Sequence, residues 1–152
     1  MIDIVSPANR SRMMSGIKGK NSTPEKKVRR LLFAAGYRFR LHRRDLPGTP
    51  DIVMPGRKIA IFVHGCFWHF HEGCRYARMP STRQAFWSAK LQSNIERDKR
   101  TMQKLTEMGW RVLNVWECAT RNLKKSKELS ESLQTWIDGD AVSGEISGSP
   151  EA

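Results

Sequence analysis

The stretch that most limits how this chain can fold is residues 64–74, where metal-binding and proton-transferring side chains crowd together. It contains three of the four histidines and two of the three cysteines of a 152-residue chain. These residue types are common ligands of zinc, and histidine also transfers protons near neutral pH. Any account of the fold and the function therefore has to accommodate this loop.

Three side chains of the loop, joined by one from a distant part of the chain, can form a single tetrahedral zinc site. The set is Cys66, His71, Cys74 and Cys118, with Cys118 expected at the end of a strand, and it uses every cysteine in the chain. His69 competes with His71 for the histidine position. The alternative interpretation is three buried free cysteines, which are common in small domains.

The net charge of +12 points to an anionic partner, with nucleic acid ahead of an anionic membrane surface. Residues 4–44 hold twelve Lys and Arg residues and one acid, whereas residues 138–152 hold four acids and no base. We find no apolar run as long as a membrane span and no secretory signal. Three cysteines do not fit a disulfide framework, so the expected compartment is the cytoplasm.

Alternating helical and strand patterns predict one α/β domain with a small mixed sheet flanked by helices. Helices are expected at residues 6–17, 23–35, 83–108 and 127–137, and strands at residues 37–41, 51–54, 58–63 and 110–117. The strand at 58–63 is apolar nearly throughout, as is typical of a central strand. The first helix has a thin apolar side, which favours a place on the surface or on a ligand. Residues 138–152 are predicted to be disordered.

Asp51 follows two prolines and is expected where a loop meets a strand. A carboxylate in such a place is a usual Mg²⁺ ligand, and it forms the first half of a common nuclease pattern. That pattern also requires an acid and a lysine on the second strand, where this chain has Phe62, Val63 and His64. The motif alone therefore does not separate a Mg²⁺ ligand from an aspartate that caps a turn.

His64 and His69 remain once His71 is assigned to zinc. A histidine beside a hydrolytic metal can accept the proton of attacking water, because its pKa lies near neutrality. The alternative is a pair of hydrogen-bonded loop histidines. Glu25, the one acid of the basic segment, is either a first-turn carboxylate stabilised by the helix dipole or a group that faces the metal.

Large aromatic rings interrupt the histidines at Phe67, Trp68 and Phe70. Rings in an irregular loop either anchor a core or stack on nucleic-acid bases. Composition alone favours the core.

Several ordered motifs closely resemble the very-short-patch repair (Vsr) endonucleases over residues 9–137. They are Pro47-Gly48-x-Pro50-Asp51, Phe62-x-His64-Gly65-Cys66-Phe67-Trp68-His69, Phe86-Trp87, Asn94-x-Glu96-Arg97-Asp98, Leu105-x-x-x-Gly109-Trp110-Arg111-Val112-Leu113 and Val115-Trp116-Glu117-Cys118. The resemblance implies a restriction-endonuclease-like fold with a structural zinc site. It also implies an enzyme that nicks duplex DNA beside the T of a T:G mismatch left by deamination of 5-methylcytosine.

The resemblance implies a role for each matching residue. In the nuclease centre, Asp51 and the backbone carbonyl of Val63 would bind Mg²⁺, Glu25 would reach metal-bound water, His69 would be the general base and His64 would lie near the phosphate. Zinc would be bound by Cys66, His71, Cys74 and Cys118. The base stack would be entered from the major groove by Phe67, Trp68 and Trp87, and from the other groove by Met14. The mismatch would be read by Lys90 and Asn94.

Two departures from the family accompany the resemblance. Val63 stands where the family usually has threonine, which leaves a carbonyl ligand but no hydroxyl, and Glu72-Gly73 lengthens the zinc loop by one residue. The chain is expected to divide into a DNA-contacting arm (1–20), an endonuclease domain (21–137) and, outside the resemblance, a disordered acidic tail (138–152). The resemblance implies a bacterial, nucleoid-associated monomer with mismatch-repair proteins as possible partners.

Two other functions fit the sequence. A restriction-type nuclease would cut a specific site without a mismatch. A zinc-stabilised DNA-binding module would perform no chemistry, but it would leave Asp51 and His69 unexplained.

Overall fold

A computed structural model describes residues 22–121 and 125–148 of the chain. The helix expected at residues 6–17, the arm that it would form and Met14 lie outside the described residues. Among the residues described, no helix has both the length and the apolar character needed to cross a membrane.

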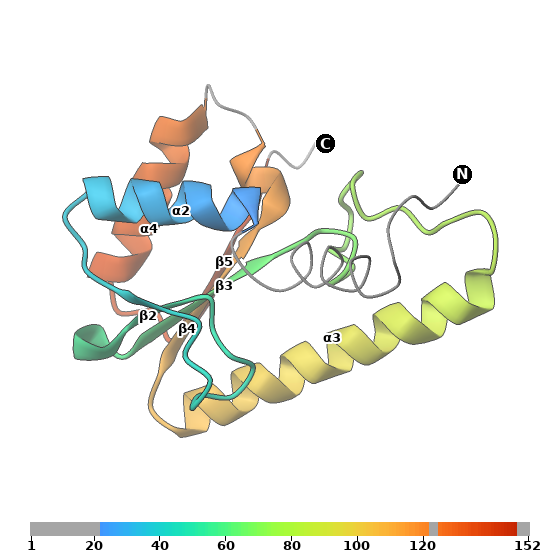
Figure 1. Ribbon diagram of the computed structural model, residues 1–152, viewed down its shortest axis with the longest axis horizontal. Helices are drawn as coiled ribbons and strands as arrows, with labels where there is room; N and C mark the ends of the chain where they lie inside the picture. The colour runs from blue at the N-terminus through green and yellow to red at the C-terminus, as the bar shows by residue number, and fades with distance from the viewer. Residues whose placement is uncertain (1–21, 122–124, 149–152) are drawn as a thin grey trace, which may run out of the picture.

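Three helices flank a five-stranded mixed sheet (Figure 1). The helices are α2 (Thr23–Ala34), α3 (Gln84–Glu107) and α4 (Ser126–Asp138). The strands lie in the order β1 (Arg40–Leu41), β2 (Ile52–Met54), β3 (Ile59–His64), β4 (Arg111–Trp116) and β5 (Ser143–Ile146). The pairs β1–β2 and β2–β3 are antiparallel, and β3–β4 and β4–β5 are parallel. The predicted mixed α/β architecture is confirmed.

The predicted start and stop signals explain the ends of the helices. The hydroxyl of Ser22 accepts a hydrogen bond from the Glu25 N–H at the start of α2, and Pro24 occupies the first turn. Gly36 and Gly109 have φ angles of +95° and +88° directly after α2 and α3, a conformation in which glycine is favoured.

Alternation along β3 divides the core into two layers. Ile59 and Ile61 pack with α2 and α4, whereas Ala60 and Phe62 pack toward α3. Helices α2 and α4 therefore cover one face of the sheet and α3 covers the other, as Figure 1 shows. His64 continues the α3-facing series, which directs its ring away from the α2–α4 core.

The carboxy-terminal tail differs from the prediction. Residues 138–152 were expected to be disordered, but residues 143–146 form β5 and extend the sheet by pairing with β4. Gly144 has no Cβ, so its backbone can lie directly against the Trp136 ring of α4. The strand was not predicted because backbone pairing and the packing of a glycine hold it, and neither produces an apolar pattern in the sequence.

Two smaller differences concern β1 and the pairing of the strands. The strand expected at residues 37–41 is only two residues long, because Tyr37 instead joins the core and donates its hydroxyl to Asp138. The sheet also has two antiparallel pairs where one was expected.

Candidate functional site

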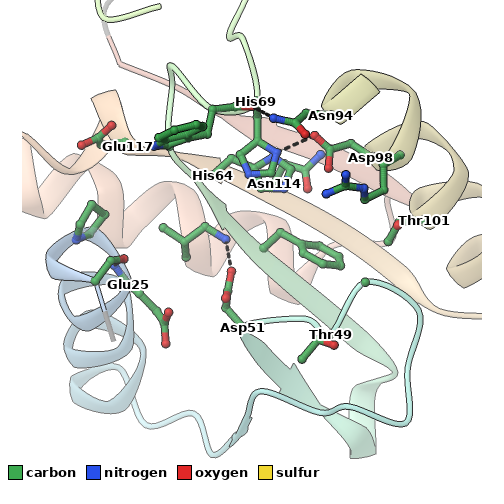
Figure 2. Close-up of a pocket in the computed structure, with 18 of the residues that line it drawn as sticks. Glu25, Thr49, Asp51, His64, His69, Asn94, Asp98, Thr101, Asn114 and Glu117 are labelled. Atoms are coloured by element: carbon green, nitrogen blue, oxygen red, sulfur yellow. Dashed lines mark hydrogen bonds and ion pairs between the residues drawn. The ribbon is translucent and has the colours of Figure 1, made fainter. Parts of the chain in front are cut away.

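A cleft of about 930 Å³ opens beside the carboxyl end of β3, between the start of α2 and the middle of α3. All four predicted catalytic residues line it, namely Glu25, Asp51, His64 and His69, as does Val63, whose backbone carbonyl was predicted to bind Mg²⁺. Figure 2 shows Glu25 and Asp51 on one side of the cleft and a group of histidine and aspartate side chains on the other.

Asp51 is tied to β3 by its carboxylate. The Val63 N–H donates a hydrogen bond of 2.7 Å to Oδ2 of Asp51, as Figure 2 shows. Burial raises the pKa of Asp51 to about 7 despite this bond, and nearby Glu25 also raises it while Arg29 lowers it. A cation bound beside Asp51 would add positive charge to that of Arg29 and so lower the free-energy cost of ionising the carboxyl.

Glu25 is buried in the first turn of α2, with only 2% of its surface exposed. Its Oε2 lies 2.7 Å from Nε2 of His42 and 3.4 Å from the Arg29 guanidinium. Ligand atoms of Glu25, His42 and Asp51 all lie within 4.8 Å of one another. These residues can hold a cation, and His42 is a member that the sequence did not reveal.

His42 occupies a left-handed backbone conformation with φ of +50°, and its N–H donates to the carbonyl of Asp51. Its only sequence signal was membership of a basic loop, which gave no indication of a buried carboxylate partner.

His64 and His69 stack face to face across the cleft, with ring centroids 3.8 Å apart and an interplanar angle of 4°. Burial, together with the positive charge that His69 can carry, lowers the pKa of His64 to about 3. The His64 ring is therefore neutral. Its Nδ1 is buried and has no hydrogen-bond partner among the residues described.

His69 is held from the opposite side by Asp98 of α3. The Nδ1 atom of His69 lies 2.6 Å from Oδ2 of Asp98 (Figure 2). A carboxylate on Nδ1 keeps the proton there and leaves Nε2 free to accept another. This arrangement suits a general base.

Asp98 was quoted within a motif but received no predicted role. The available signal was helical spacing, because Lys90, Asn94 and Asp98 are four residues apart and share one face of α3. All three line the cleft. Asn94 is mostly buried and its amide donates to the Trp68 carbonyl at 2.7 Å, so it also fixes the histidine loop.

The predicted wedge residues form one aromatic group at the cleft. Phe67 packs edge-on against Trp68 and Trp87, with centroids 5.1 and 5.4 Å apart, and Phe86 extends the group. The three predicted wedge rings are only partly buried, and Phe86 is 47% exposed. Partly exposed rings beside a cleft are available for stacking on bases.

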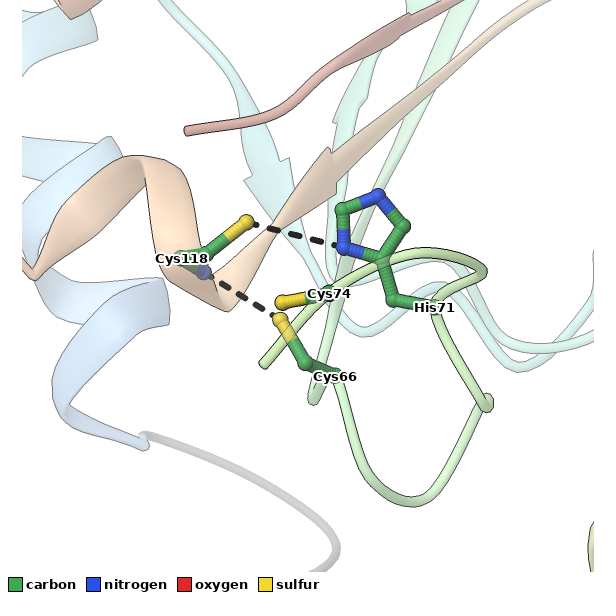
Figure 3. Close-up of side chains that lie close together, drawn as sticks. All are labelled: Cys66, His71, Cys74 and Cys118. Atoms are coloured by element: carbon green, nitrogen blue, oxygen red, sulfur yellow. Dashed lines mark hydrogen bonds between the residues drawn. The ribbon is translucent and has the colours of Figure 1, made fainter. Parts of the chain in front are cut away.

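The four predicted zinc ligands come together in a second group, shown in Figure 3, which we call the Cys/His group: Cys66, His71, Cys74 and Cys118. One ligand atom from each lies within 4.8 Å of all the others, and His71 Nδ1 is 3.6 Å from Cys118 Sγ. The alternative assignment of His69 to this group does not fit, because His69 lies with His64 and Asp98 instead. Three thiols and an imidazole form a donor set typical of structural zinc.

Tight turns in the loop after β3 gather three of these ligands. The His71 N–H donates to the Cys66 carbonyl, the Cys74 N–H donates to the His71 carbonyl, and Gly73 adopts a φ angle of +74°. Burial raises the pKa of the Cys66 and Cys118 thiols and lowers the pKa of His71. The neutral imidazole is ready to bind a metal, whereas each thiol must lose its proton on binding.

Comparisons with known proteins agree with this geometry. Residues 2–75 match the family model described as DNA mismatch endonuclease Vsr. The chain is also 43% identical over 148 residues to the DNA mismatch endonuclease Vsr of Escherichia coli, an alignment that covers 96% of this chain and 94% of that protein. The chain belongs to the Vsr family. Membership identifies it as an endonuclease and confirms the resemblance that the motifs predicted.

Other relatives of this Vsr family member carry a different description. The chain is 52% identical over 123 residues to the Type II nicking enzyme V.XorIIP of Xanthomonas oryzae pv. oryzae, covering 81% of this chain and 90% of the relative. The fold resembles the catalytic domain of the homing endonuclease I-Bth0305I, with a TM-score of 0.51 and 20% identity over 78% of this chain and 100% of that one. That likeness supports the fold alone.

Proposed function

We propose that the chain nicks one strand of duplex DNA beside the T of T:G mismatches and so starts very-short-patch repair. The observation that carries this proposal is the convergence on one cleft of two groups from distant parts of the chain. Asp51 and Glu25 form a cation-binding side, and His69 with Asp98 forms a proton-accepting side. Hydrolysis of a phosphodiester requires both.

The cation-binding side fits Mg²⁺, because it presents two carboxylates and Mg²⁺ prefers oxygen ligands. Asp51 would bind the ion directly with the Val63 carbonyl, which does not depend on the side chain at that position. Glu25 is held by His42 and Arg29, which suits a carboxylate that hydrogen-bonds a water of the ion. When bound, Mg²⁺ would neutralise the phosphate and stabilise the leaving 3′-oxygen.

On the other side of the cleft, His69 accepts the proton of the attacking water at Nε2. Asp98 holds the ring in the required tautomer and stabilises the charge that the ring acquires. His64 stacks on His69 and stays neutral, so it restricts the ring without opposing that charge strongly. As the family resemblance implies, His64 would lie near the phosphate.

The Cys/His group fits zinc by its donor chemistry, and we assign it a structural role. It joins the loop after β3, which holds His69, to the short helix that follows β4, where Cys118 lies. A bound ion would fix the path of this loop and with it the position of the general base. The restriction-endonuclease-like fold implied by the resemblance is consistent with this arrangement.

Selectivity for the mismatch is assigned to the aromatic group and to α3. Phe67, Trp68 and Trp87 would enter the base stack, which opens at lower cost where a pair is mismatched. Lys90 and Asn94 line the same cleft and would read the exposed base edges. Met14 would enter the base stack from the other groove, and residues 1–20 would form a DNA-contacting arm.

The remaining expectations concern the setting of the enzyme. We propose that it acts as a monomer in the bacterial cytoplasm, close to the nucleoid, and that mismatch-repair proteins receive its product. The net charge of +12 favours DNA as the partner.

The deciding experiment is a nicking assay with Mg²⁺ on an end-labelled duplex that carries one T:G mismatch in varied flanking sequences. A matched duplex with T:A at the same position is the control. We expect a single cut on the T-containing strand of the mismatched duplex and no cut in the control. Product length on a sequencing gel gives the position of the cut.

A restriction-type nuclease is the alternative function, and the names of relatives described as Type II nicking enzymes keep it in view. It predicts equal cutting of the matched and mismatched duplexes in one sequence context. Binding without cleavage in any context would instead favour a DNA-binding module, and neither of these results is compatible with the proposed function.

Replacement of Asp98 by asparagine is expected to slow nicking about 10²- to 10³-fold, because the amide no longer fixes the proton on Nδ1 of His69. Single-turnover rates on the mismatched duplex measure this loss. Glu96→Gln is the matched control, since Glu96 is exposed on the same helix and does not line the cleft. Equal rates for both variants would show that Asp98 plays no part in the reaction.

Replacement of Trp68 by alanine is expected to reduce the preference for mismatched over matched duplex about 5- to 100-fold, since stacking of one base on an aromatic ring is worth about 1–3 kcal/mol. The ratio of binding constants for the two duplexes is the measurement. Phe33→Ala serves as control, because Phe33 is 60% exposed on α2 and outside the cleft. An unchanged ratio for Trp68→Ala would remove this ring from mismatch recognition.

A further inference from the structure

The last described residues of the chain lie against the Cys/His group. The Gly148 N–H donates to Sγ of Cys118 at 3.2 Å, and the Cys118 N–H donates to Sγ of Cys66 at 3.3 Å. Figure 3 shows the second of these contacts. Backbone N–H groups directed at sulfur stabilise negative charge on it, which a thiol gains when it binds a metal.

The approach of Gly148 depends on its lack of a side chain. A Cβ atom at this position would lie 2.8 Å from the carbonyl oxygen of Cys118 and 3.1 Å from its carbonyl carbon. Both neighbours are backbone atoms, which cannot move aside as the end of a side chain can. Only glycine therefore allows the chain to pass this close to Cys118.

A second contact runs from β5 to the histidine ligand. Oε1 of Glu145 accepts a hydrogen bond of 2.7 Å from the indole Nε1 of Trp116. The Trp116 ring stacks on His71, with centroids 4.1 Å apart and an interplanar angle of 6°. Glu145 thus positions the Trp116 ring, against which the His71 imidazole stacks.

Both contacts are delivered by one element. β5 pairs in parallel with β4 from Val112 to Val115, which sets Glu145 beside the end of β4 and leads the chain on to Gly148. The segment 143–148 consequently contacts two of the four members of the Cys/His group, one directly and one through Trp116.

We propose that residues 143–148 form the outer shell of the metal site, with Gly148 positioning Cys118 and Glu145 positioning His71 through Trp116. The carboxy-terminal segment then keeps the metal bound, in addition to extending the sheet. This inference rests on the proposed zinc site. Loss of such outer partners typically weakens metal binding about 10- to 100-fold.

The test measures zinc in the full chain by elemental analysis and its release into an excess of a chromogenic chelator. We expect one zinc per chain in the wild type and in every variant of the segment. Gly148→Pro, which removes the N–H and adds bulk, and Glu145→Ala are expected to release zinc about tenfold faster or more. Glu145→Gln keeps an acceptor oxygen and is expected to restore slow release.

Two controls separate the possible failures. Ser143→Ala changes an exposed side chain of the same strand and should release zinc at the wild-type rate. Thermal melts of the chelated proteins should coincide, which shows that the variants lose metal rather than fold. Wild-type release rates in Gly148→Pro and Glu145→Ala would overturn the outer shell while leaving the zinc site intact. Absence of zinc from the wild type would overturn the site itself.

Discussion

Asp51→Asn is expected to reduce Mg²⁺-dependent nicking about 10³-fold or more while leaving affinity for the mismatched duplex unchanged or slightly higher. The carboxylate is the group that would hold the cation directly, and a cation at the phosphate contributes several kcal/mol to transition-state stabilisation. Removal of one negative charge from the cleft does not oppose binding of the anionic DNA backbone. Single-turnover nicking and a gel-shift titration in the absence of Mg²⁺ measure the two quantities separately.

The same variant should stabilise the metal-free protein. The folded-state pKa of Asp51 is about 7, above its ordinary value of 3.8, so ionisation of this carboxyl opposes folding. The free energy of unfolding that Asp51 contributes below pH 3.8 is progressively lost as the pH rises through about 7. Asparagine does not ionise and so avoids this loss, and its amide oxygen can still accept the hydrogen bond from the Val63 N–H. Melts in EDTA should show a higher midpoint for Asp51→Asn at pH 8 and a smaller difference at pH 5.

Undiminished nicking by Asp51→Asn would remove Asp51 from the cation site. A lower melting midpoint at pH 8 would instead contradict the electrostatic cost inferred for the buried carboxyl. The two outcomes are independent, so the assignment of the cation ligand and the account of the pKa can fail separately.

Cys66→Ala is expected to abolish zinc binding and to lower the free energy of unfolding by at least about 3 kcal/mol, because the binding energy of a structural metal is also folding energy. For a chain of this size, that corresponds to a fall of about 6–12 °C in the melting midpoint. Cys66 is fully buried and comes from the loop that carries His69, the proposed general base, so nicking should fall as well. Calorimetry and elemental analysis provide the measurements.

Chelation separates the ligand effect from the loss of a buried side chain. Treatment of the wild type with a strong chelator should lower its melting midpoint nearly to that of Cys66→Ala, and the same treatment should leave the variant unchanged. Equal midpoints for chelated and untreated wild type would mean that the Cys/His group does not stabilise the fold through a metal.

Local signals in the sequence were enough to predict the elements that surround the cleft. A hydroxyl cap and a proline marked the start of α2, and a nearly continuous apolar run marked β3 as a central strand. The three cysteines of the Cys/His group were also predictable, because one site could use every cysteine in the chain, whereas the choice of His71 over His69 came from the family resemblance. In each case the deciding information lies within a few residues or within the residue types themselves.

Contacts between distant elements were not predictable from the same signals. Glu25 meets His42 across 17 positions, and His69 meets Asp98 across 29, with both pairings set by how helices pack on the sheet. β5 was missed for a related reason, since its pairing uses backbone groups and its one glycine, Gly144, packs by lacking a side chain. Residue composition carries no trace of either kind of contact.

The order of the Cys/His ligands along the chain has a consequence for the synthesis of the enzyme. Glu25, Asp51 and His69 are made first, whereas Cys118 follows α3 and β4, and the segment 143–148 follows α4. Domains fold largely as units, and contacts between residues far apart in sequence form only when both partners exist. On the proposed assignment, a growing chain on the ribosome would contain Glu25, Asp51 and His69 before it contains the residues that complete the Cys/His group, so we expect cleavage to begin only after the carboxy-terminal residues emerge.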